Sequence, residues 1–273
     1  MRGIQTPTGL KGKDLHAFIV SKLDSVIAIK KMAMKLADSV CFTGSIVDRE
    51  GAVSKAAMPS VVDTDVIKNS TVINTCYWFD SHGDVHIPGI WNKSLKDNSK
   101  RSENGILLLQ EHKMQFDKII ADGSDVIPYT KTMTWKELGV DFPGETEALV
   151  FDNTIRKSRN EFMFSQYGAG HVKNHSVGMR YVDIELAINT EQKDYKEYKE
   201  RWEKYIDKIA NRDEVDEEGL FWAIIEAKVV EGSPVPKGSN VVTPVLQTTS
   251  TKNEPPLSTH EEPQEKSWFS LIK

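Results

Sequence analysis

Two residues in this chain have the types and settings that acyl transfer requires, a histidine and a serine. His112 follows a short apolar run that ends at Gln110, and Ser176 precedes Val177 and Gly178. Serine attacks a carbonyl group only when a base takes its proton, and the base works best when a third group orients it. The chain therefore offers His112 as a candidate base and Ser176 as a candidate nucleophile for such chemistry.

Glu226 is one carboxylate that could complete this set. It lies inside the apolar run from Phe221 to Val230, where an ionised carboxylate needs a cationic or hydrogen-bonding partner. An imidazolium would serve, and so would Lys228 or another lysine. Taken singly, each residue also has an ordinary interpretation, because strand-end histidines often cap or fill a core and serines are common in turns.

A metal site is the competing chemistry. Four possible ligands fall within seven residues, and two further histidines are four residues apart; the six are Asp80, His82, Asp84, His86, His171 and His175. Histidines at i and i+4 bind zinc on a helix, but Gly168 and Gly170 argue against a helix there, and no HExxH is present. Residues 80–84 are typical of a turn, where polar side chains are expected anyway. We therefore predict no metal and no cofactor.

Short strands are predicted to position the histidine and the serine. Residues 105–110 form a continuous apolar run of strand length that ends just before His112. Residues 181–188 alternate between Val182, Ile184, Leu186 and Ile188 on one face and charged residues on the other, which predicts a half-buried strand just after Ser176. Further strands are expected at residues 72–79, 85–89 and 146–151, with a turn at 80–84.

Helical periodicity marks three other segments. Apolar residues recur at helical spacing from Asp14 to about Asp38 and again over residues 153–166, where glycines end the pattern. The clearest helix is expected over residues 191–212, which carry a Tyr/Trp/Ile stripe between alternating charges. We divide the chain into an N-terminal helical and turn-rich extension (1–70), a catalytic domain (71–231) with the charged helix inserted, and a tail (232–273).

The tail is predicted to be disordered from its composition. Six of the eleven prolines fall in residues 232–273, among many Ser and Thr residues. The net charge of −5 gives no basic surplus for nucleic acid, and we expect no nucleic-acid partner. No run of about 18 apolar residues is present, so no membrane span or membrane partner is expected. Cys41 and Cys76 are predicted to be free thiols.

Several segments, in this order, resemble the prohead (capsid maturation) proteases of tailed bacteriophages, which share a fold with the herpesvirus assemblins. Asp84–Gly89, with Gly83 in front, is similar to that family's Gly-Asp-x-x-x-Pro-Gly stretch. The apolar strand ending at His112 comes next. Ser176-Val177-Gly178-Met179 is similar to the family's Ser-Ile/Val-Gly-Phe/Met, and Ile225–Val230 resembles its Leu-x-Glu-x-Ser-x-Val strand. The resemblance spans about residues 72–235.

The resemblance implies an α+β fold, with a mostly antiparallel, barrel-like sheet surrounded by helices. It implies a self-processing serine endopeptidase with His112, Ser176 and Glu226 as catalytic residues. Its substrates would be the scaffold and the major coat protein during capsid maturation. The enzyme would work as a homo-oligomer inside the assembling prohead, in the host cytoplasm. The long gap between Ser176 and Glu226 departs from the family pattern, and a non-catalytic capsid-associated or scaffolding protein with a protease-like fold is the alternative.

Overall fold

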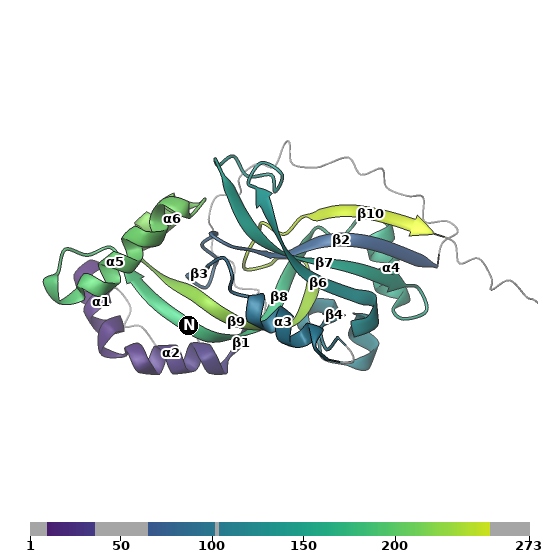
Figure 1. Cartoon of the computed structure of the whole chain (residues 1–273), viewed down its shortest axis with the longest axis horizontal. Helices are drawn as coiled ribbons and strands as arrows, with labels where there is room; N and C mark the ends of the chain where they lie inside the picture. Colours follow the sequence, from purple (N-terminus) through teal and green to yellow (C-terminus); the bar gives the residue numbers. More distant parts are fainter. Residues whose placement is uncertain (1–9, 36–64, 102–103, 252–273) are drawn as a thin grey trace, which may run out of the picture.

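The computed structural model describes residues 10–35, 65–101 and 104–251 (Figure 1). Their helices are α1 (Gly12–Ser21), α2 (Leu23–Met32), α3 (Asn92–Ser99), α4 (Glu161–Gly168), α5 (Lys196–Tyr205) and α6 (Arg212–Glu218). Their strands are β1 (Met34–Lys35), β2 (Val66–Thr75), β3 (Asp84–His86), β4 (Leu107–Leu109), β5 (Ile119–Ala121), β6 (Val126–Thr134), β7 (Glu145–Arg156), β8 (Asn174–Ile188), β9 (Leu220–Val235) and β10 (Val245–Thr251). Short 3-10 turns include η2 (Gln110–His112), which follows β4 directly.

The strands form two sheets. One has six strands in the order β1-β8-β9-β4-β5, with β3 also pairing with β9, and the other has four in the order β10-β2-β7-β6. Strands β3 and β4 run parallel to β9, while the remaining pairs are antiparallel. The predicted α+β class is confirmed. The barrel-like expectation is wrong, because within the described residues both sheets stay open and the terminal strands of each order do not pair with each other.

The main hydrophobic core lies between the two sheets. Phe151 and Ile73 of the four-stranded sheet and Val177 of the six-stranded sheet belong to one buried cluster. Gly232 of β9 faces the same core, because a Cβ built on it would lie 2.6 Å from Phe151 Cε2. Since side chains alternate along a strand, the neighbours of Val177 and Gly232 point to the opposite face of the six-stranded sheet.

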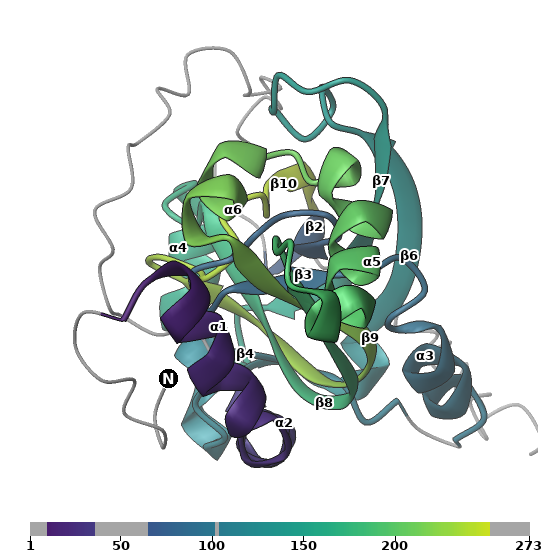
Figure 2. The same ribbon diagram turned by 90° about the vertical axis from the view of Figure 1, so that its left-hand side faces the viewer.

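The N-terminal helices belong to this fold and pack on the six-stranded sheet. Ile19 of α1 and Val26 of α2 join the main core, and Lys30 of α2 forms a buried ion pair with Asp84 of β3. The single helix predicted from residue 14 is instead two helices with a break at Lys22, followed by β1. Figure 2 shows α1 and α2 on one side of the β8–β9 pair and α5 and α6 on another.

The predicted tail is wrong for residues 232–251. Residues 232–235 complete β9, and β10 pairs with β2 along the edge of the four-stranded sheet. Residues 252–273 lie outside the described residues, as do Cys41 and residues 43–64. Composition misled the prediction because Thr and Ser are compatible with a strand when a partner strand is available.

Two other predicted elements differ in detail. The helix expected over residues 191–212 is α5 followed by a 3-10 turn, with Tyr198, Trp202 and Tyr205 buried as its stripe indicates. In β8 the predicted alternation fails at Val182, which is exposed, because bulges shift the β8–β9 register on either side of Asp183. A bulge inserts an unpaired residue and so changes which face the next side chain occupies.

Candidate active site

The pairing of β8 with β9 places four residues on one face of the six-stranded sheet. Ser176 lies opposite Ser233, and Gly178 lies opposite Glu231. Directly opposed residues in an antiparallel pair point to the same face, with Cβ atoms about 5 Å apart. The register is regular from Asn174 to Gly178, so these four residues share the face that is turned away from the core between the sheets.

His112 reaches this face from β4. That strand runs parallel to β9, with Leu107 opposite Glu231, and continues into the turn η2. Glu111 and His112 have φ angles of 51° and 59°, in the left-handed region that L-residues seldom adopt. Such backbone strain persists only where surrounding contacts hold it, and it is common at active sites. Here the turn directs the imidazole back over β9.

A closed set of hydrogen bonds joins His112, Glu231 and Ser233. Glu231 Oε1 lies 2.5 Å from His112 Nδ1, and Ser233 Oγ donates to Glu231 Oε2 at 2.6 Å. The backbone N–H of His112 donates to Ser233 Oγ at 3.0 Å. Glu231 and Ser233 are almost fully buried, which strengthens these bonds. The set fixes the histidine at both its ring and its backbone.

Gly178 gives the Glu231 carboxylate its space. A Cβ at position 178 would lie 1.9 Å from Glu231 Oε1 and 2.7 Å from the carboxyl carbon. Any larger residue would therefore displace the oxygen that contacts the imidazole. The glycine of the Ser-Val-Gly segment is thus required by the close approach of a carboxylate from the neighbouring strand.

The tautomer that results is the one a general base needs. A carboxylate only accepts hydrogen bonds, so His112 Nδ1 carries the proton, and Nε2 of a neutral ring keeps its lone pair. Nε2 is buried and has no hydrogen-bond partner among the described residues. Ser176, about 6% exposed, points to the same face, although no hydrogen bond joins its hydroxyl to the imidazole in the described residues. In serine hydrolases, the hydrogen bond between nucleophile and base often tightens only when substrate is bound.

Glu226 lies elsewhere on β9. Its carboxylate accepts from Lys93 Nζ at 2.8 Å, and 31% of its side chain is exposed. Glu226 and Glu231 are five positions apart, roughly 16 Å along β9. The structure therefore brings His112 to Glu231 instead of Glu226, and Glu226 has the lysine partner that the sequence left open.

A signal for Glu231 was present in the sequence. The Glu-x-Ser-x-Val part of the family pattern fits Glu231-Gly232-Ser233-Pro234-Val235, whereas the position two residues after Glu226 is Lys228. The predicted match at Ile225–Val230 lies five residues too early, because Gly232 and Pro234 are typical of the end of a strand and favour a tail. The corrected placement leaves both His112 and Ser176 unchanged.

The remaining histidines with described partners serve other contacts. His175 is fully buried beside Tyr167, whose hydroxyl lies 3.0 Å from His175 Nε2, and burial lowers the pKa of His175 to about 4. His171 is exposed and contacts Gln166. The two histidines therefore have different partners, and neither belongs to a group of three possible metal ligands among the described residues.

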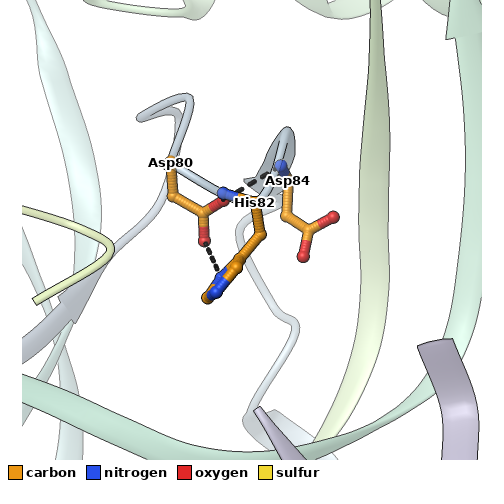
Figure 3. Close-up of side chains that lie close together, drawn as sticks. All are labelled: Asp80, His82 and Asp84. Carbon is orange, nitrogen blue, oxygen red and sulfur yellow. Dashed lines mark hydrogen bonds and ion pairs between the residues drawn. The ribbon is translucent and has the colours of Figure 1, made fainter. Parts of the chain in front are cut away.

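Asp80, His82 and Asp84 do converge, with ligand atoms within 4.8 Å of one another (Figure 3). Asp80 Oδ1 accepts from the backbone N–H groups of His82 and Asp84 at 2.8 and 3.0 Å, as expected for a tight turn. Asp84 also contacts the ammonium group of Lys30 and accepts from Tyr181 at 2.8 Å. The lysine supplies the positive charge beside Asp84, and the cluster connects α2 to β3.

No model of a protein family, no curated protein and no solved structure matches the chain. Among the described residues, no helix is both long enough and apolar enough to cross a membrane.

Proposed function

We propose that this protein is a serine endopeptidase in which Ser176 is the nucleophile, His112 the general base and Glu231 the residue that orients the base. The observation that carries the proposal is the 2.5 Å contact between Glu231 and His112 Nδ1, on the face of the sheet to which Ser176 points. A buried carboxylate, an imidazole with a vacant Nε2 and a serine on adjacent strands are the parts that acyl transfer needs.

The reaction follows from these positions. His112 Nε2 takes the Ser176 hydroxyl proton as Oγ bonds to the carbonyl carbon of the scissile peptide. The imidazolium that forms is stabilised by Glu231, and it then protonates the leaving amine as the C–N bond breaks. Water attacks the resulting acyl-enzyme with the same base, releasing the acid and restoring Ser176.

The substrate class is proposed from the resemblance to prohead proteases. Scaffold and coat-protein segments, cut during capsid maturation inside the assembling prohead, are the expected substrates, together with the enzyme itself. An enzyme that acts within a closed shell meets its substrates at very high local concentration, so slow turnover is compatible with this role.

Active-site labelling tests the proposal. A fluorophosphonate should modify the wild-type protein at Ser176, as located by peptide mapping, and cleavage of a co-expressed scaffold or coat protein should disappear in Ser176→Ala. His112→Ala should lower the rate at least a thousand-fold while circular dichroism remains unchanged. Ser233→Ala tests the other serine beside His112: it should still be labelled at Ser176, at a lower rate because Ser233 helps to hold Glu231 and the His112 backbone. Labelling that depended on Ser233 would transfer the nucleophile's role to that residue.

The burial of Ser176 favours one other function, a capsid-associated or scaffolding protein with a protease-like fold. Such a protein would give equal inactivity for the wild type and Ser176→Ala, and no labelling. A chelator distinguishes the metal alternative, because a metalloenzyme would lose activity on metal removal and the proposed enzyme would keep it.

A further inference from the structure

Two exposed cations lie on the same face of the six-stranded sheet as the candidate catalytic residues. Side chains at positions i, i+2 and i+4 line one face of a strand, so Arg180 follows Ser176 and Gly178 on that face of β8. The residue between the last two, Met179, is buried in the main core, as this alternation requires. Lys228 of β9 lies directly opposite Arg180, and both cations are exposed. The candidate site therefore continues along the sheet into a pair of positive charges.

The two like charges face each other without a compensating acid. Directly opposed residues in an antiparallel pair have Cβ atoms about 5 Å apart, and like charges at such positions are destabilising. No side-chain hydrogen bond or ion pair joins Arg180 or Lys228 to an acid of the part of the chain that the structure describes. Glu226, two residues before Lys228 on β9, is already paired with Lys93 Nζ at 2.8 Å. An anionic group bound from outside would offset the repulsion.

The distance from this cation pair to Ser176 suits a contact with the substrate away from the bond that is cut. No β8 side chain stands between Arg180 and Ser176 on this face, because the position between them is Gly178. The Cα atoms of Ser176 and Arg180 are four strand residues apart, about 13 Å. A substrate extended along this face would advance by about 3.3 Å per residue, so the long cationic side chains could reach a residue about two to four positions from the scissile bond.

We propose that Arg180 and Lys228 bind an acidic side chain of the substrate, an aspartate or glutamate about two to four residues from the bond that is cut. The inference rests on the proposed function and specifies the substrate class of that site. Arginine presents a planar fork of donors that matches a carboxylate, and lysine adds a second positive charge from the neighbouring strand. The two cations determine which peptide binds, while the reacting groups are those of Ser176 and His112.

Cleavage-site profiling tests the inference. Purified full-length protein digests a library of peptides of mixed sequence, and mass spectrometry locates the cuts. In wild-type digests, aspartate and glutamate should be enriched at one position about two to four residues from the cut. In Arg180→Glu/Lys228→Glu, lysine and arginine should be enriched at that position instead, because the two charges on the sheet are reversed. A wild-type profile without acidic enrichment would overturn the inference.

Two peptides that differ only by Glu or Gln at the enriched position measure the size of the effect. The wild type should cut the Glu peptide with about tenfold higher kcat/KM, because a hydrogen bond to a charged acceptor is stronger than one to a neutral amide. The difference should lie in KM, since a contact away from the reacting atoms stabilises the bound substrate and the transition state alike. Arg180→Gln/Lys228→Gln should bring the ratio of the two kcat/KM values to about one, and about 0.5 M NaCl should reduce the wild-type ratio by screening.

Lys131→Gln is the matched control, because it removes an exposed positive charge from β6 in the other sheet. It should keep the wild-type ratio. If the ratio fell as far in Lys131→Gln as in the double variant, a general effect of net charge would replace the inference. A double variant that cut both peptides more slowly by the same factor would also contradict it, because such a defect is structural and leaves specificity unaltered.

Failure of this inference and failure of the proposed function give different results. If a fluorophosphonate labels Ser176 and peptides are cut, but the wild type does not prefer the acidic peptide, the inference is wrong and the protease stands. If Ser176 is not labelled and no peptide is cut, both are wrong.

Discussion

Replacing Glu231 by glutamine removes the charge beside His112, the proposed general base, and keeps the shape of the side chain. The carboxylate lies 2.5 Å from His112 Nδ1, in a position that is 1% exposed. A unit charge about 4 Å from the centre of the developing imidazolium is worth about 4 kcal/mol at an effective dielectric constant of 20. Losing that stabilisation in the transition state corresponds to roughly a thousand-fold in kcat. We therefore expect Glu231→Gln to lower kcat about a thousand-fold with little change in KM.

The assay is single-substrate peptide hydrolysis, with a peptide cut by the wild type and circular dichroism to verify the fold. Glu226→Gln is the matched control, since it removes the same charge from the same strand where the carboxylate pairs with Lys93 at the surface. Partly exposed ion pairs of this kind contribute little to stability, so the kcat of Glu226→Gln should stay within about twofold of the wild-type value. A Glu231→Gln enzyme within tenfold of the wild type would refute the assignment, as would greater damage from Glu226→Gln.

Three further results are expected. Gly178→Ala should lower kcat at least a hundred-fold, measured with the same peptide, because its Cβ would lie 1.9 Å from Glu231 Oε1 and push the carboxylate from the imidazole. Burial lowers the pKa of His175 to about 4, so as the pH falls the unfolded state is protonated at this residue before the folded state is. The free energy of unfolding should therefore decrease by about 3 kcal/mol between pH 6.5 and pH 4. Urea unfolding of His175→Gln should show a weaker dependence of stability on pH, and the same dependence as the wild type would contradict the role of His175. Burial raises the pKa of the Cys76 thiol, so iodoacetamide should label Cys76 only in urea, as located by mass spectrometry.

The sequence predicts correctly those strands whose local hydrophobic pattern agrees with their burial in the fold. The apolar run before His112 is a buried strand, and the segment after Ser176 is one as well, because both follow the period of a half-buried or buried strand. Sequence order alone could not show that β4 lies parallel to β9, which is the pairing that brings His112 to Glu231. Long-range register depends on packing between sheets and not on local preference.

Glu231 was missed because two of its neighbours usually end strands. Gly232 is needed where Phe151 comes too close for a side chain, and Pro234 lies at a position whose partner, His175, gives its N–H to Thr243. Neither residue therefore costs the sheet a hydrogen bond. The high Ser and Thr content likewise predicted disorder at β10, whose Thr and Ser residues pair with β2. Rules about Gly, Pro and Ser describe isolated segments, and here strand partners override them.

The pairing of β10 with β2 has a practical consequence for working with this protein. β10 is the outer strand of the four-stranded sheet, so it shields the hydrogen-bonding edge of β2, a ten-residue strand with mostly buried side chains. A shortened version that stops before Val245 would present that edge to other molecules, and unprotected edges of this length favour intermolecular strand pairing and precipitation. A reporter or affinity tag fused after Thr251 would leave the shield intact.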